Sequence, residues 1–242
     1  MHEALGKVAA RGARAVVNLL KAHGARIALL FLGVLLPLWL FAEIGEEVHE
    51  VEKFVFDAPI LLAAHQHGGP ALDRFFLWIS HAGYQYGVIP IDIVLVLALL
   101  VIKRWREATF AGVSFLGAAL LNMGAKQFFA RDRPSLWESI SPESSFSFPS
   151  AHAMGSMTLV MTVILLAWPT RWRWPVTLLA TLFVLLVGAS RIYLGVHYPS
   201  DVIGGWVAAV AWVVGVYVAL FWGPRRPWAR DPIESAAAED QR

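Results

Sequence analysis

The sequence predicts an all-α integral membrane protein, a six-transmembrane-helix bundle with interfacial helices at the membrane surface. Two observations predict this fold class. First, 57% of the 242 residues are hydrophobic and only 16% are charged, whereas a soluble domain carries about 25% charged residues. Second, the hydrophobic residues gather in long segments, and a membrane-spanning helix needs about 20 of them. The chain has no cysteine, which excludes disulfides and thiolate metal sites.

Six apolar segments are expected to cross the membrane. They are residues 27–42, 86–102, 108–129, 151–168, 174–190 and 200–222. We interpret the first as an uncleaved anchor, because its basic flank is long and no small-x-small cleavage site follows it. Asp92 lies deep in the second span and is either a structural hydrogen-bonding group or part of a polar path. Glycines of the third and sixth spans are expected to permit close helix packing, namely Gly112, Gly117, Gly204 and Gly205.

The remaining segments flank or connect these spans. Residues 1–26 form an N-terminal segment whose cations share one helical face, which predicts an amphipathic helix lying on the membrane. Residues 27–223 form the six-span domain, and residues 224–242 form a polar cytoplasmic tail that we expect to be disordered. The acidic connection 43–85 contains two apolar stretches that are too short to span, so we expect helices at the membrane surface there.

The basic residues predict the topology. They gather in the N-terminal segment and in residues 103–107, 171–173 and 223–230. These segments alternate as one side of a six-span protein should, and the positive-inside rule assigns that side to the cytoplasm. We therefore expect a multi-pass protein of the cell (inner) membrane with both termini cytoplasmic. The loops 130–150 and 191–199 face the periplasmic or extracellular side, yet they contain arginines that need another explanation.

Three outward-facing segments, KQFFARDRP, FPSAH and SRIYLGVHYPSD, concentrate the polar residues. Lys126, Arg133 and Arg191 supply three cations, which suit a phosphate dianion. Ser150 begins the fourth span, where backbone N–H groups point out of the helix. The N–H groups of Ala151 and His152 at this helix N-terminus form a natural anion site.

The same segments contain a candidate acid–base pair. Asp201 follows His197 by four residues, so it can hold one ring nitrogen as N–H and leave the other free to attack. His152, from another span, is placed to donate a proton to a leaving group. Each motif alone is weak, because arginines at helix ends often snorkel to headgroups, but three together favour catalysis. For Arg131 and Asp132 we favour a local ion pair or a headgroup contact.

These segments resemble the type 2 phosphatidic acid phosphatase family, which shares its site with vanadium haloperoxidases. They match the family's K-x6-RP, PS-x-H and SR-x5-H-x3-D motifs within residues 126–201. One departure is Ala151, where glycine is commoner, although the backbone N–H remains. The six-span layout extends the resemblance over most of the chain.

The resemblance implies a metal-independent phosphatase that needs no cofactor. His197 would attack phosphorus in line and form a phosphohistidine, while Asp201 steadies the imidazolium. His152 would protonate the departing oxygen and then activate water. The phosphate oxygens would be held by Lys126, Arg133, Ser150, the backbone of Ala151 and Arg191.

The expected substrate is a lipid phosphate or diphosphate with its tail in the bilayer. Undecaprenyl diphosphate and phosphatidylglycerophosphate rank first, followed by phosphatidic acid and by lipid A as the substrate of a lipid A phosphatase. A haloperoxidase is disfavoured by the membrane spans. A non-catalytic lipid transporter would use the cations without the histidine chemistry. We expect no nucleic-acid partner, and the oligomeric state stays open.

Overall fold

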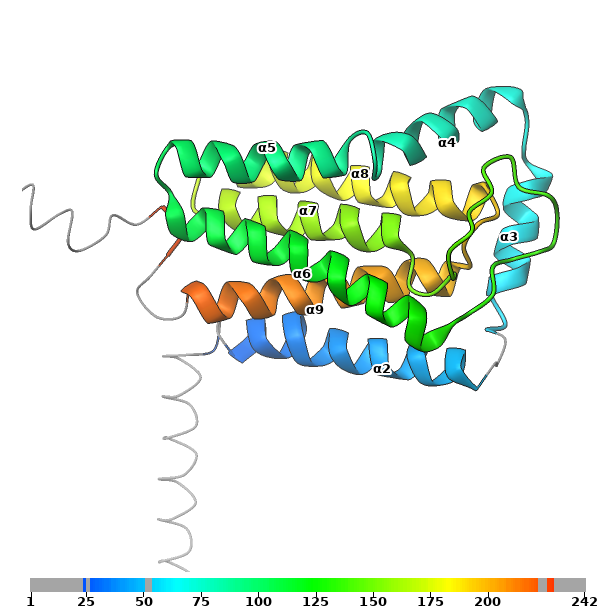
Figure 1. Cartoon of the computed structure of the whole chain (residues 1–242), viewed down its shortest axis with the longest axis horizontal. Coiled ribbons are helices and arrows are strands. Elements are labelled where there is room, and N and C mark those ends of the chain that lie inside the picture. The colour runs from blue at the N-terminus through cyan, green and yellow to red at the C-terminus, as the bar shows by residue number, and fades with distance from the viewer. Residues whose placement is uncertain (1–23, 25–26, 51–53, 222–225, 229–242) are drawn as a thin grey trace, which may run out of the picture.

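A computed structural model describes residues 24, 27–50, 54–221 and 226–228. Every regular element in this part of the chain is a helix, so the predicted all-α fold is confirmed (Figure 1). The elements are η1 (Phe31–Leu35), α2 (Leu36–His49), α3 (Asp57–Gln66), α4 (Pro70–Ala82), α5 (Val88–Val101), α6 (Trp105–Phe129), α7 (Ala151–Ala167), α8 (Arg173–Tyr193) and α9 (Pro199–Phe221). The predicted amphipathic helix and most of the predicted tail lie outside the described residues.

Six apolar helices correspond to the six predicted spans. Four are long and apolar enough to cross a membrane, namely Ile27–His49, Trp105–Phe129, Arg173–Tyr193 and Pro199–Phe221. The two shorter ones, α5 and α7, pack beside them in the bundle. The two short apolar stretches form α3 and α4, which lie together at one end of the bundle (Figure 1). The protein is therefore a helical membrane protein.

Three spans are longer than the sequence indicated, and one of them, α6, begins at Trp105, three residues before its expected start. The first helix continues to His49, seven residues beyond the expected end at residue 42. Its π-helical turn η1 comes directly before Pro37, which lacks the N–H that a regular ladder would use. At the other boundary, α8 continues to Tyr193, so Arg191 lies in its last turn and not in the loop. Gly195 follows with φ +69°, a left-handed conformation that suits glycine after a helix end.

Helix α7 lies at the centre of the bundle and packs against α6, α8 and α9. Glycines on α9 allow this approach, because a Cβ added at Gly205 would stand 2.8 Å from the Ser150 carbonyl oxygen. A Cβ at Gly204 would clash with the Phe148 ring, and one at Gly117 would clash with Trp212. The prediction is wrong for Gly112, because a Cβ there would have no neighbour within 4 Å.

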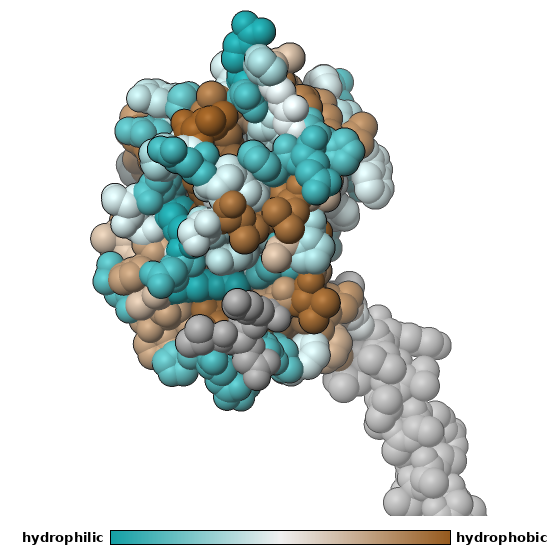
Figure 2. All heavy atoms as spheres, turned by 90° about the vertical axis from the view of Figure 1, so that its right-hand side faces the viewer, coloured by the Kyte–Doolittle hydropathy of each residue, from teal (hydrophilic) through white to brown (hydrophobic). Residues whose placement is uncertain are grey.

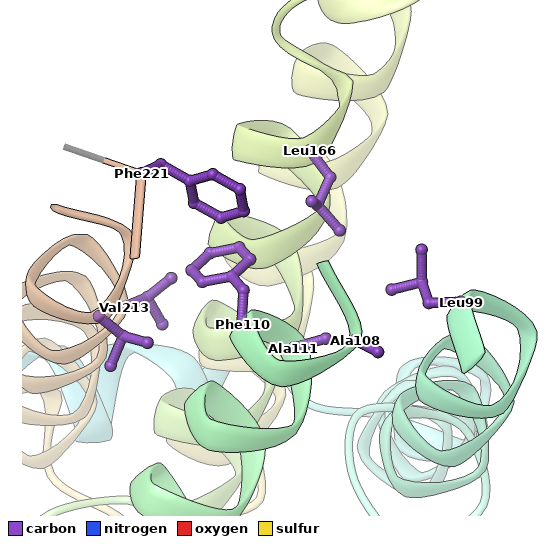
Figure 3. Close-up of a cluster of buried hydrophobic side chains, with 8 residues drawn as sticks. Leu99, Ala108, Phe110, Ala111, Leu166, Val213 and Phe221 are labelled. Atoms are coloured by element: carbon purple, nitrogen blue, oxygen red, sulfur yellow. The ribbon is translucent and has the colours of Figure 1, made fainter. Parts of the chain in front are cut away.

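An aromatic cluster closes the end of the bundle where the basic connections lie. Phe110 of α6 faces Phe221 of α9, with ring centroids 5.6 Å apart and an edge-on angle of 81° (Figure 3). Leu166 of α7 packs in the same cluster. Trp228 extends the cluster, because its backbone N–H donates to Glu107 Oε1 at 2.6 Å and its indole N–H donates to the Leu166 carbonyl at 2.7 Å.

The opposite end is polar. It holds the loop 130–150, the start of α9 and the helix α3, which packs against α8 and α9 (Figure 1). Figure 2 shows this end face-on, with hydrophilic residues covering much of it and smaller hydrophobic patches among them. All three predicted polar motifs lie at this end.

Candidate active site

Four helix ends bring the predicted site residues together. Lys126 lies in the last turn of α6 and Arg191 in the last turn of α8. Ser150 is the N-cap of α7, and Asp201 lies in the first turn of α9. Most of these side chains are buried, including Lys126, Ser150, Arg191, His197 and Asp201. Charged groups are costly to bury unless they are paired, so each needs an identified partner.

A backbone hydrogen bond joins two of these helix ends. The N–H of Ser150 donates to the carbonyl of Asp201 at 3.1 Å. The Ser150 hydroxyl in turn accepts from the N–H of Ala153 at 3.5 Å, as an N-cap side chain should. This arrangement places the first turn of α7, with the N–H groups of Ala151 and His152, next to the first turn of α9.

His197 and Asp201 form a close pair. His197 Nδ1 lies 3.4 Å from Asp201 Oδ2, and that oxygen also accepts from the Tyr198 N–H at 2.9 Å and from the Ser147 hydroxyl. On the other side of the ring, Arg133 Nη1 lies 3.1 Å from Nε2. A guanidinium can only donate, so Nε2 is the acceptor and Nδ1 carries the proton that faces Asp201.

The surroundings of His197 keep its imidazole neutral. Burial, followed by the charges of Arg191 and Arg133, lowers the pKa of His197 well below its ordinary value of 6.5. The ring is fully buried in the loop between α8 and α9. At neutral pH Nε2 is therefore unprotonated, and its electron pair accepts from Arg133. An unprotonated nitrogen is the form that a histidine nucleophile needs.

Glu143 is the residue that the sequence analysis missed. Its Oε2 lies 2.7 Å from Arg133 Nη2, and its Oε1 pairs with Arg191 Nη2. The same carboxylate stands 3.9 Å from His152 Nδ1 and 3.9 Å from His197 Nε2. Two arginines thus hold a two-oxygen anion between the two histidines. The signal in the sequence was an acid in a serine-rich segment, SPESS, which is separated from FPSAH by two residues.

The charges around Glu143 keep it ionised. Burial raises the pKa of this carboxyl, but the neighbouring basic side chains, Arg191 first among them, together lower the pKa below its ordinary value. The cations have further contacts in the same loop. Lys126 Nζ lies 3.3 Å from Ser145 Oγ and contacts the Phe146 carbonyl. The loop therefore lies directly over the predicted phosphate-binding residues.

Arg131 belongs to the site as well. It ion-pairs with Asp201 Oδ1 at 2.5 Å and with Asp57 Oδ2 at 3.0 Å. Both partners are distant in sequence, so spacing within the motif gave no signal for either pair.

His65 and His67 lie apart from this cluster: His65 stacks on Trp137, and His67 is exposed. Among the residues that the structure describes, no cluster of three metal-ligating side chains is found.

Two cavities flank α6 near the site. One, of about 330 Å³, lies between α5, α6 and α7, and Asp92, Asn122 and Ala151 line it. Asp92 Oδ1 is buried there with no hydrogen-bond partner among the described residues. The other, of about 580 Å³, is lined by apolar side chains of α2, α6 and α9 and by Pro149. Ala151 and Pro149 both adjoin Ser150, so each cavity reaches the first turn of α7.

This fold and site define an integral membrane enzyme whose cations hold an oxyanion between two histidines. The family model of the PAP2 superfamily matches residues 107–225. The chain therefore belongs to the PAP2 superfamily, and the predicted family and enzyme class, a phosphatase, are confirmed.

Similar proteins include two curated membrane enzymes and one solved structure. The chain is 32% identical over 148 residues to an undecaprenyl-diphosphatase of Sulfolobus acidocaldarius, covering 59% of this chain and 67% of the relative. It is 29% identical over 141 residues to phosphatidylglycerophosphatase B of Bacillus subtilis, covering 56% and 69%. The crystal structure of a PAP2-type phosphatidylglycerolphosphate phosphatase from Bacillus subtilis has a TM-score of 0.66 and 26% identity, and the match covers 74% of this chain and 93% of that one.

Proposed function

We propose that this protein hydrolyses a lipid phosphate or diphosphate through a phosphohistidine on His197. The observation that carries the proposal is the position of the Glu143 carboxylate. It is held by Arg133 and Arg191 and stands 3.9 Å from each histidine. A phosphate group in the same place would meet a nucleophile on one side and a proton donor on the other.

In the first step, Nε2 of His197 attacks the terminal phosphorus as its P–O bond to the lipid breaks, an ester bond in a monophosphate and an anhydride bond in a diphosphate. His152 gives its proton to the departing oxygen, so a monophosphate releases a lipid alcohol and a diphosphate releases a protonated lipid phosphate. The Nδ1 proton of His197 faces Asp201, whose negative charge stabilises the ring as it becomes cationic. Arg133, Arg191 and Lys126 stabilise the charge on the phosphoryl oxygens.

In the second step, water attacks phosphorus as the N–P bond breaks. His152 is now unprotonated and accepts a proton from this water, which restores both histidines and releases inorganic phosphate. The backbone N–H groups of Ala151 and His152 at the N-terminus of α7 offer further donors to the oxyanion.

The surroundings of the site support a lipid as the substrate. The apolar cavity of about 580 Å³ lies within the bundle and ends at Pro149, next to Ser150. It offers an acyl or isoprenoid chain a place near the phosphate site. The relatives named above favour undecaprenyl diphosphate and phosphatidylglycerophosphate. Phosphatidic acid and lipid A phosphate groups are the next candidates, the latter supported by a lipid A 4'-phosphatase relative.

Phosphate release from purified protein in detergent tests the proposal. The panel contains the four candidate lipids, and each is measured with the wild type, His197→Ala and His67→Ala. His67 is exposed at the end of α3 and serves as a matched control. We expect the first variant to lose phosphate release and the second to retain it. Wild-type turnover by His197→Ala would exclude the phosphohistidine, and lipid transport without phosphate release would identify a transporter.

We also propose that residues 27–223 are the catalytic domain, in the inner membrane, with the site on the periplasmic side. The basic connections at the end opposite the site support this orientation. A reporter fused after residue 242 tests it. The fusion should be active only with a reporter that works in the cytoplasm, and an outward-facing C-terminus would reverse the orientation.

A further inference from the structure

Asp201 uses its two carboxylate oxygens for different partners. Oδ2 faces His197 and accepts from the Tyr198 N–H and the Ser147 hydroxyl. Oδ1 accepts from Arg131 Nη1 at 2.5 Å. The carboxylate is fully buried, so an unpaired charge there would be costly and Oδ1 depends on its cationic partner.

Arg131 is itself held in place from three sides. Its Nη2 lies 3.0 Å from Asp57 Oδ2, its Nη1 donates to the Ser200 hydroxyl at 2.8 Å, and its guanidinium lies 4.2 Å from the centroid of the Tyr198 ring. Asp57 also binds Ser200, accepting from its backbone N–H at 2.9 Å and from its hydroxyl at 2.5 Å. Asp57 thus connects the first turn of α3 to the first turn of α9.

Arg131 and Arg133 therefore contact opposite sides of the pair formed by His197 and Asp201. Arg133 contacts the ring of His197 and the carboxylate of Glu143, where the phosphate is proposed to bind. Arg131 contacts Asp201 on the side away from His197, and its other polar side-chain partners in the described part of the chain are Asp57 and Ser200. Their roles should differ accordingly, although only one residue separates them.

We propose that Arg131 is a positioning residue for the hydrolysis proposed above, and that Asp57 holds Arg131 in place. Arg131 holds Oδ1 of Asp201 and so keeps Oδ2 turned towards the Nδ1–H of His197. Without its charge, the carboxylates of Asp57 and Asp201 share a buried region with no cation between them, and Oδ1 loses its partner. Asp201 then turns away from the ring and no longer offsets the positive charge that develops on His197 during attack.

A double-mutant cycle on turnover tests this role. Arg131→Met in the wild type should lower kcat about 10- to 100-fold, the size expected from losing one hydrogen bond to a buried charge, with KM changed less than about twofold. In the Asp201→Ala background, Arg131→Met should change kcat less than about twofold, because its effect passes through the missing carboxylate. An equal loss in both backgrounds would overturn the proposal and show a general structural role. Arg133→Met is the matched control and should impair both backgrounds.

A second pair of variants covers the case in which Arg131→Met does not fold, as judged by its melting temperature in detergent. Arg131→Lys keeps the charge and should retain more of kcat than Arg131→Met. Asp57→Asn should lower kcat in the wild type but not in Asp201→Ala, and a loss in both would again overturn the proposal. The proposed function is tested separately: full turnover by the single Asp201→Ala variant would contradict that mechanism whatever Arg131 does.

Discussion

The two ends of the bundle are built on different principles. At one end, Phe110, Phe221 and Leu166 pack by shape, and Trp228 adds two hydrogen bonds (Figure 3). At the other end, buried cations and carboxylates are compensated by one another. Substitutions at the apolar end should therefore change stability with little effect on turnover, whereas substitutions at the charged end should change turnover first.

Phe110→Ala is expected to have the largest effect on stability. The ring is fully buried and contacts helices α7 and α9, so its loss leaves a cavity between three spans. We expect destabilisation of about 3 kcal/mol, the low end for Phe→Ala, because lipid and not water is the alternative environment. Unfolding in detergent measures it, and kcat per folded molecule should stay at the wild-type value. Phe128→Ala is the control, because that ring is 70% exposed. A large fall in kcat for Phe110→Ala would contradict the expectation that the apolar end changes stability and not turnover.

Arg191→Lys is the corresponding change at the charged end. One guanidinium contacts both Ser80 on α4 and Glu143 in the loop, and it is 1% exposed. A single ammonium lacks the planar fork that serves two partners at once. We expect kcat/KM to fall about 100-fold, equivalent to about 2.7 kcal/mol of transition-state binding. Arg74→Lys, on the exposed face of α4, should leave kcat/KM unchanged. An unchanged kcat/KM in Arg191→Lys would show that Arg191 does not bind the phosphate.

The pH dependence of stability should also differ between the two ends of the bundle. The folded protein holds His197 neutral well below pH 6.5, while the unfolded chain protonates it near that pH. Below pH 6.5 the unfolded state therefore binds more protons, and stability falls as the pH falls. Between pH 6.5 and 5.5 this histidine should cost about 1 kcal/mol.

Unfolding at the two pH values, for the wild type and for His197→Gln, checks this. The variant should lose about 1 kcal/mol less than the wild type over this interval. Phe110→Ala introduces no titratable group, so it should shift stability equally at both pH values. Identical pH slopes for the wild type and His197→Gln would mean that His197 is not held neutral.

Glu143→Gln is expected to have the smallest effect, and in the favourable direction. The carboxylate stands between Arg133 and Arg191, where the phosphate is proposed to bind, so it must leave when substrate enters. Without its negative charge, the side chain binds the two arginines more weakly, so the substrate displaces it more easily. KM should therefore fall about 3- to 10-fold while kcat is retained. Glu138→Gln, exposed in the same loop, should change nothing. A fall in kcat for Glu143→Gln would instead indicate that the carboxylate takes part in the chemistry.

The sequence predicted what depends on local pattern. Long apolar segments predicted the six spans, and the expected start of the sixth at residue 200 lies one residue from the observed start of α9 at Pro199. The sequence did not predict that α8 extends through Arg191, because a charged residue normally marks the end of an apolar segment. It also missed Glu143 and the pairing of Arg131 with Asp57, 74 residues away. Such pairs depend on how helices meet, and no periodicity along the chain encodes them.

The hydrogen bond from the Ser150 N–H to the Asp201 carbonyl has a consequence for how this protein can diversify. The segments that carry His152 and His197 are fastened to each other through the main chain. The spacing between the two histidines therefore depends on the main chain more than on the side chains around them. The cavity walls and the loop 130–148, apart from Arg131, Arg133, Glu143 and Ser147, can change to suit another lipid while this spacing stays the same. Gly205 is the exception, because any larger residue there would press on the Ser150 carbonyl and alter that spacing.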